Sequence, residues 1–192
     1  GYDVAAEIYA ATSRSNLARR EFAKSYSNAL RAVELRPGNL LYWRALAAAK
    51  FALRQYSSMA TDLAAFRSLG GGKLDEEDAY RLAAAYYFQA QYEKVVPLTQ
   101  ELIAENRAYA APYVLQGYAY TAQKRFAEAE RTFLDVLRMF PTQQLAVEGL
   151  AHLYFLGGNK AGALDILEQT AKFPFPPESR PRFEALKALY AQ

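Results

Sequence analysis

Few side chains in this sequence could do acid, base or nucleophilic chemistry. His152 is the only histidine and the chain contains no cysteine, so neither a histidine pair nor a thiolate can bind zinc or attack a substrate. A lone imidazole on a helix is more often a surface residue than a general base. These observations predict a protein that is not an enzyme and that uses no metal or cofactor.

Two short segments resemble ligand sites only in part. The acidic run Asp75-Glu76-Glu77-Asp78 directly precedes a predicted helix. Carboxylates there cap the first amides and complement the helix dipole, so we interpret the run as a helix start rather than a cation site. The segment Gly70-Gly71-Gly72-Lys73 lacks the preceding strand and the Lys-Ser/Thr pair of a phosphate-binding loop, and we interpret it as a linker.

Composition and charge describe a folded chain without a strong electrostatic preference. Of 192 residues, 52% are hydrophobic and 22% are charged, which is typical of a globular protein. The net charge is only +3, with the basic excess in the first sixty residues, where we interpret it as a solvated helix face. The uncharged runs contain tyrosine, glutamine and glycine, so none is expected to span a membrane. Because the first residue is Gly1 rather than methionine, we expect the intact protein to be longer.

The helices that must position these side chains are predicted by an internal repeat of the sequence. A small residue recurs at intervals of 34, 36, 34 and 34 residues, at Ser13, Ala47, Ala83, Gly117 and Ala151. Within each unit the apolar residues follow a helical spacing that breaks once near the middle, which predicts two helices per unit. Pro37 and Pro141 end units, while the linker at 70–72 accommodates the two extra residues of the longer interval.

A continuous repeat array has no internal domain boundary, since each unit shares its core with its neighbours. We therefore predict a single domain over 1–192, whose last element is a capping helix near 178–191. Pro97 lies inside a predicted helix, which it should kink or whose start it should delay. The units are expected at about 6–39, 40–75, 76–109, 110–143 and 144–177.

At these positions the sequence resembles the tetratricopeptide repeat (TPR) family. The fourth unit carries its large, glycine, tyrosine, aromatic, alanine, aromatic and proline positions at Tyr113, Gly117, Tyr120, Phe126, Ala129, Phe133 and Pro141. The resemblance implies an all-α, right-handed superhelical solenoid of about five helix–turn–helix units plus a C-terminal capping helix. It also implies a concave groove lined by the first helix of each unit.

The expected groove positions lie one residue after the packed face of each first helix, a turn of about 100°. They are rich in aromatic side chains, which dominate protein-recognition hot spots. We expect a peptide or partner helix there; the alternative is that the aromatics pack on neighbouring first helices as core. Arg14 and Arg44 would receive an acidic group of the partner or, as the alternative, remain solvated arginines. The candidate residues are Arg14, Arg44, Phe51, Tyr80, Tyr87, Tyr118, Thr121, His152 and Phe155.

The resemblance implies a non-enzymatic scaffold that binds a protein or peptide partner. The alternative is a structural assembly module that self-associates through its outer helix faces or ends. Nucleic acid is not expected, because the middle section is net negative and the groove lacks a continuous basic stripe. The groove also lacks the lysine and asparagine set of TPR domains that grip chaperone tails. The composition suggests a bacterial domain of the cytoplasm or periplasm. Analogy with similar bacterial TPR domains favours a role in an envelope or export assembly.

Overall fold

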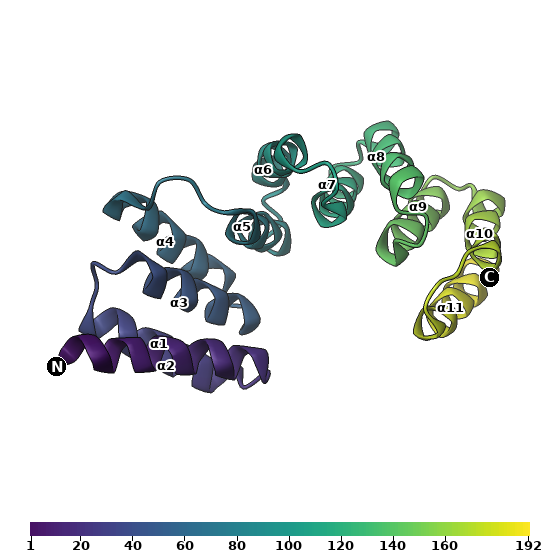
Figure 1. The fold of residues 1–192 in the computed structure, drawn as a ribbon. Coiled ribbons are helices and arrows are strands. Elements are labelled where there is room, and N and C mark those ends of the chain that lie inside the picture. Colours follow the sequence, from purple (N-terminus) through teal and green to yellow (C-terminus); the bar gives the residue numbers. More distant parts are fainter. The chain divides into compact units, whose positions relative to one another are not determined.

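The computed structural model describes residues 1–192, apart from the side chain of Tyr2, and throughout this part of the chain the fold is all-α (Figure 1). Each predicted repeat contains two α-helices separated by a short turn, as the sequence pattern predicted, and one further helix follows the fifth repeat. The helices are α1 Tyr2–Ala18, α2 Phe22–Leu35, α3 Leu40–Ala52, α4 Tyr56–Phe66, α5 Glu76–Phe88, α6 Tyr92–Glu105, α7 Ala110–Ala122, α8 Phe126–Met139, α9 Gln144–Leu156, α10 Lys160–Gln169 and α11 Arg180–Tyr190.

Contacts divide the chain into two compact units, Gly1–Gln91 with α1 to α5 and Tyr92–Gln192 with α6 to α11. We call them unit 1 and unit 2. Within each unit, consecutive helices pack against one another. The prediction of one domain over 1–192 therefore remains a prediction.

The core of unit 1 is built from small side chains that let helices approach closely. Ala6 and Ala10 of α1 and Ala29 of α2 are fully buried. Where α1 and α2 meet, the buried hydroxyls of Ser13 and Ser25 each donate to the other residue's backbone carbonyl, at 2.8 and 2.9 Å. These reciprocal bonds satisfy the polar groups that the close contact buries.

In unit 2 a single aromatic ring holds three helices together. Phe133 of α8 is completely buried, and a Cβ atom built on Gly117 of α7 would lie 2.6 Å from its ring. A Cβ atom on Gly149 of α9 would lie 2.4 Å from the same ring. Both positions must therefore be glycine for the ring to fit.

The last helix closes unit 2. Phe183, Leu186 and Tyr190 of α11 are buried in a core that also contains Ala163 and Leu167 of α10. The preceding segment contributes Phe175, whose ring meets that of Phe183 edge-on at 5.0 Å. The observed helix lies within the range predicted for a cap.

Two local expectations have different outcomes. Asp75 is the N-cap of α5, and its side chain accepts a hydrogen bond from the Asp78 amide at 2.9 Å, which confirms the acidic run as a helix start. In contrast, α6 begins at Tyr92 and contains Pro97, so the start of the helix is not delayed, and a kink at Pro97 stays a prediction. A proline inside a helix removes one amide donor and crowds the carbonyl four residues earlier, and α6 continues through Pro97 all the same.

Candidate functional site

Three helices of unit 1 enclose an open hollow of about 370 Å³, which we call the unit-1 hollow. Two of the predicted groove residues, Arg14 and Arg44, line it together. The lining residues are Ser13, Arg14 and Leu17 from α1, Leu41, Arg44, Ala45 and Ala48 from α3, and Glu77, Asp78 and Arg81 from α5.

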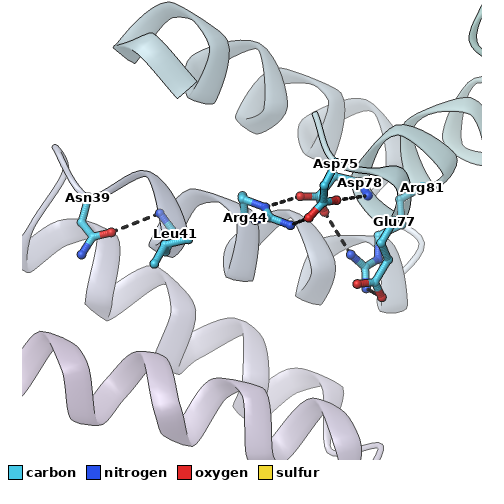
Figure 2. Close-up of polar contacts among 7 residues, drawn as sticks. All are labelled: Asn39, Leu41, Arg44, Asp75, Glu77, Asp78 and Arg81. Atoms are coloured by element: carbon cyan, nitrogen blue, oxygen red, sulfur yellow. Dashed lines mark hydrogen bonds and ion pairs between the residues drawn. The ribbon is translucent and has the colours of Figure 1, made fainter. Parts of the chain in front are cut away.

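The charged side chains that α3 and α5 contribute to the unit-1 hollow pair with charges of the same chain (Figure 2). The Arg44 guanidinium bonds to both Asp75 and Asp78, joining α3 to the start of α5. Arg81 donates to the same Asp78 carboxylate at 3.0 Å and also pairs with Glu77. Because the Asp78 side chain is only 1% exposed, these two arginines stabilise a buried charge and are poorly placed to receive a partner's acid.

Arg14 differs from the other two arginines of this hollow. It is exposed, and no ion pair joins it to another of the described residues. Of the predicted pair, Arg14 is thus the one with its guanidinium available to a carboxylate of a partner.

Unit 2 contains a second open hollow of about 390 Å³, the unit-2 hollow, formed by α7, α9 and α11. It brings together three predicted groove residues, Tyr118, His152 and Phe155. The remaining lining residues are Glu148 of α9 and Arg182, Leu186, Leu189 and Tyr190 of α11.

Sequence reasoning missed the contribution of α11, which it assigned only to capping. A signal was present, because the 34-residue interval applied once more carries Glu148 to Arg182, His152 to Leu186 and Phe155 to Leu189. The capping helix therefore occupies the register of a further first helix. Its flank faces the hollow while its apolar side covers α10.

The wall of the unit-2 hollow is aromatic and firmly supported. The Phe155 ring stacks on Tyr190 with centroids 4.5 Å apart, while Tyr118 meets the buried Phe133 edge-on at 5.4 Å. The Tyr118 hydroxyl donates to the Leu145 carbonyl at 2.9 Å. These contacts hold the rings of Tyr118 and Phe155 in place and leave both partly exposed at the hollow.

The polar rim of the same hollow is a chain of hydrogen bonds around a buried carboxylate. Glu148 is 8% exposed and accepts from Gln144 at 2.7 Å and from Arg182 at 3.1 Å. The Tyr190 hydroxyl lies 3.4 Å from Nδ1 of the exposed His152, and burial raises the pKa of Tyr190. The hollow thus offers an apolar wall beside neutral and charged polar groups.

The other four predicted residues line neither hollow. Thr121 is buried and donates to the Gly117 carbonyl at 2.9 Å, while Phe51 and Tyr87 meet neighbouring aromatic rings edge-on. Burial raises the pKa of Tyr80. The assignment of these four residues to a partner-binding groove stays a prediction.

Two other kinds of site are absent from the described residues. Among them, no group of three histidine, cysteine, aspartate or glutamate side chains is arranged to hold a metal ion. None of their helices combines the length and apolar character that crossing a membrane requires.

Comparison with known proteins finds similar structures but no similar sequence among the family models and curated proteins. No protein-family model and no curated protein matches the sequence. The fold, however, is similar to MamA 41-end from Desulfovibrio magneticus RS-1, with a TM-score of 0.77 at 16% identity, covering 88% of this chain and 94% of that one.

Two further solved structures are described as TPR proteins. YrrB, a TPR protein with an unusual peptide-binding site, has a TM-score of 0.73 at 14% identity, covering 96% of this chain and 91% of that one. A thermophilic TPR protein from Thermus thermophilus, TTC0263, has a TM-score of 0.67 at 17% identity, covering 97% of each chain. Together with the paired helices and their 34-residue spacing, these likenesses show that the chain has the tetratricopeptide-repeat fold.

Proposed function

We propose that this protein is a non-enzymatic interaction scaffold and that the unit-2 hollow binds a segment of a protein partner. The observation that supports this most directly is the meeting of Tyr118, His152 and Phe155 with Leu189 around one open hollow. Half-exposed aromatic rings held by their neighbours present apolar area at low entropic cost, as binding hot spots do.

The chemistry of the unit-2 hollow suggests the form of the bound segment. An apolar side chain of the partner would lie against Phe155 and the exposed Leu189, which is 52% accessible. Backbone or side-chain polar groups would reach His152 and Arg182 at the rim. A peptide alternating apolar and polar groups satisfies both, and Arg14 in unit 1 offers a separate contact for an acidic residue.

The setting is a further part of the proposal. The likeness of the fold to YrrB, described as having a peptide-binding site, supports a peptide or protein as the ligand class. We propose that such a scaffold works in a bacterial envelope or export assembly. The basis is the composition of the chain and the analogy with similar bacterial TPR domains described above.

The test uses exposed residues so that binding changes without unfolding. We would replace Leu189 by aspartate and His152 by alanine, and compare affinity capture from a native extract with that of the wild type. The matched control is Met139→Asp, because Met139 is an exposed apolar residue of α8, 43% accessible, that does not line the unit-2 hollow. Circular dichroism and melting temperature must match in all three proteins.

The decisive step follows capture. Each protein retained by the wild type is purified and titrated against the wild type, the Leu189→Asp/His152→Ala variant and the control. We expect the variant to bind at least ten-fold more weakly, a loss of about 1.4 kcal/mol, while the control binds normally. Equal binding by wild type and variant would show that the unit-2 hollow is not the binding site.

A further inference from the structure

The first helix of the chain exposes a face that every later first helix buries. Positions equivalent to Ile8, at the repeat intervals, are Tyr42, Asp78, Pro112 and Ala146, and each is at most 3% exposed. Ile8 itself is 60% exposed. The same holds for the exposed Ser15, whose equivalents are at most 4% exposed, at Ala49, Ala85, Ala119 and Leu153.

The buried equivalents show what normally covers this face. In unit 1 the α2 helix packs on α3, and Ala29, Ala32 and Val33 share a core with Tyr42 and Leu46. A helix lying across the first helix is therefore the established way to bury this face in the chain. On α1 no described helix occupies that position: α2 and α3 contact α1, and its buried residues, such as Ala6 and Ala10, lie on the opposite side.

The exposed face of α1 is an uncharged stripe, which we call the α1 stripe. It consists of Val4, Ile8, Ala11 and Ser15, spaced alternately by four and three residues, and all four are exposed. That spacing places them on one side of a helix and is typical of the seam along which two helices pair. Val4 and Ile8 are 62% and 60% exposed, a large apolar area for one helix.

The α1 stripe is complementary to itself. Its large residues, Val4 and Ile8, lie in the first half and its small residues, Ala11 and Ser15, in the second. Antiparallel pairing with an identical stripe therefore places large side chains against small ones at every level.

The charges beside the α1 stripe have the same arrangement. Glu7 lies on the flank of its first half and Arg14 on the same flank of its second half. In an antiparallel pair each flank faces its own copy, so Glu7 of one chain lies within one helical turn of Arg14 of the other. Glu7 accepts one hydrogen bond from Tyr42 through Oε1 at 2.8 Å, which leaves Oε2 for the second chain.

We propose that the α1 stripe binds the α1 stripe of a second copy, forming an antiparallel, two-fold symmetric dimer. The dimer shares Arg14 with the proposed partner contacts but no residue with the unit-2 hollow, so binding at that hollow and dimer formation can be tested separately. One helix pair buries less area than a permanent dimer needs, and the dimer should therefore form and dissociate with protein concentration.

The first experiment is sedimentation equilibrium of the purified chain from micromolar to millimolar concentration. We expect the mass to rise from the 21.5 kDa of one chain toward twice that value. Ile8→Asp should weaken association at least ten-fold by placing a charge in the apolar contact. Met139→Asp, which changes an exposed apolar residue of α8 in the same way, should leave it unchanged.

Charge exchange tests the orientation of the pair. Arg14→Glu should weaken the dimer because it places two carboxylates together, and Glu7→Arg/Arg14→Glu should restore it because the opposite charges meet again. A helix that merely became less stable would not regain association in the double variant.

Spin labels test the antiparallel geometry directly, since the chain has no cysteine of its own. A label on Ala11→Cys should lie near its copy, offset by about 5 Å along the helix axis, whereas labels on Val4→Cys should be offset by about 16 Å. A monomer at every concentration, association that survives Ile8→Asp, or equal distances for both labels would overturn the proposal.

Discussion

At the scale of single residues, Lys50 and Asp62 form a largely buried ion pair that joins α3 to α4. The Lys50 ammonium lies 2.9 Å from Oδ1 and 2.8 Å from Oδ2 of Asp62, and both side chains are largely buried. Burial raises the pKa of Asp62 above its ordinary 3.8, although Lys50 acts in the opposite direction. Desolvation of the carboxylate is thus the larger effect, and the pair is required chiefly because each charge needs the other.

We expect Lys50→Met to destabilise the protein by about 3 kcal/mol at neutral pH, because it leaves the Asp62 carboxylate buried and unpaired. Lys50→Met/Asp62→Leu should recover most of that loss, since the double variant buries no charge. Urea denaturation of the wild type and both variants measures the difference. A double variant as unstable as the single one would contradict this explanation.

The raised pKa of Asp62 also predicts a direction of pH dependence. The folded state holds the carboxyl proton more tightly than the unfolded state, so the contribution of this group to stability falls as pH rises from 3.8 through the raised value. We expect the loss in Lys50→Met to shrink in acid, where Asp62 becomes neutral. Asp62→Asn should lack this part of the pH dependence, which the same urea series at several pH values would show.

At the scale of elements, the turn inside each helix pair has one fixed backbone geometry. In all five pairs, the residue two positions before the start of the second helix has a positive φ, between 56° and 80°. The next amide bonds to the carbonyl five residues earlier, as in Gln91 to Tyr86 at 2.9 Å and Asn159 to Tyr154 at 2.9 Å. The five residues are Arg20, Arg54, Ala90, Lys124 and Gly158, at the repeat intervals.

Only the last of these turns has the residue that its geometry favours. A left-handed conformation costs an ordinary residue about 1–2 kcal/mol, which glycine avoids. We expect Ala90→Gly to stabilise the protein by about 1 kcal/mol and Gly158→Ala to destabilise it by a similar amount. Chemical denaturation of the two variants gives both values.

The neighbouring glycine supplies the control. Gly157 has φ of −77°, and a Cβ atom there would meet no atom closer than 3.5 Å. Gly157→Ala should therefore change stability little, whereas a Cβ on Gly158 meets nothing within 4 Å and acts only through the backbone. If both alanine variants lost the same stability, the left-handed conformation would not be the cause.

These turns show why part of the fold was predictable and part was not. The spacing of Gly117 and Phe133 predicts a close helix contact, because small and large residues at helical intervals imply which faces meet. Arg20, Arg54 and Lys124 gave no sign of a left-handed turn, since tertiary packing of the two helices imposes a conformation that their own preferences oppose. The repeat interval and not the residue type carries that information.

The candidate site was predictable to the same degree. Helical geometry placed Tyr118, His152 and Phe155 on one face, and that face is hollowed. It did not show that Arg44 pairs with Asp75 and Asp78, because the acidic run was interpreted only as the start of a helix.

At the scale of the whole molecule, the sequence predicts one continuous array, while contacts group the residues into two units. In a continuous array, each repeat gains stability from its neighbours, so a substitution that destabilises one repeat lowers the stability of the whole chain. If unit 1 and unit 2 were independent domains, a destabilising substitution would lower the stability of its own unit alone.

The only tryptophan distinguishes these cases. Trp43 lies in unit 1, half-buried, with its indole N–H donating to the Pro37 carbonyl at 2.7 Å, so its fluorescence reports that unit alone. We expect the fluorescence and circular dichroism transitions of the wild type in urea to coincide. We further expect Leu150→Ala, a buried leucine of unit 2, to move the Trp43 transition to lower urea.

The matched variant is Leu63→Ala, which removes a leucine that is 1% exposed in unit 1, and each truncation should cost about 2–5 kcal/mol. If the array is continuous, both variants shift the Trp43 signal in the same direction because unit 1 loses support from unit 2. If Leu150→Ala moves only the circular dichroism signal and leaves that of Trp43 unchanged, the chain consists of two separately folding units, and the prediction of a single domain is wrong. That outcome would also mean that a partner could bind unit 2 without stabilising unit 1.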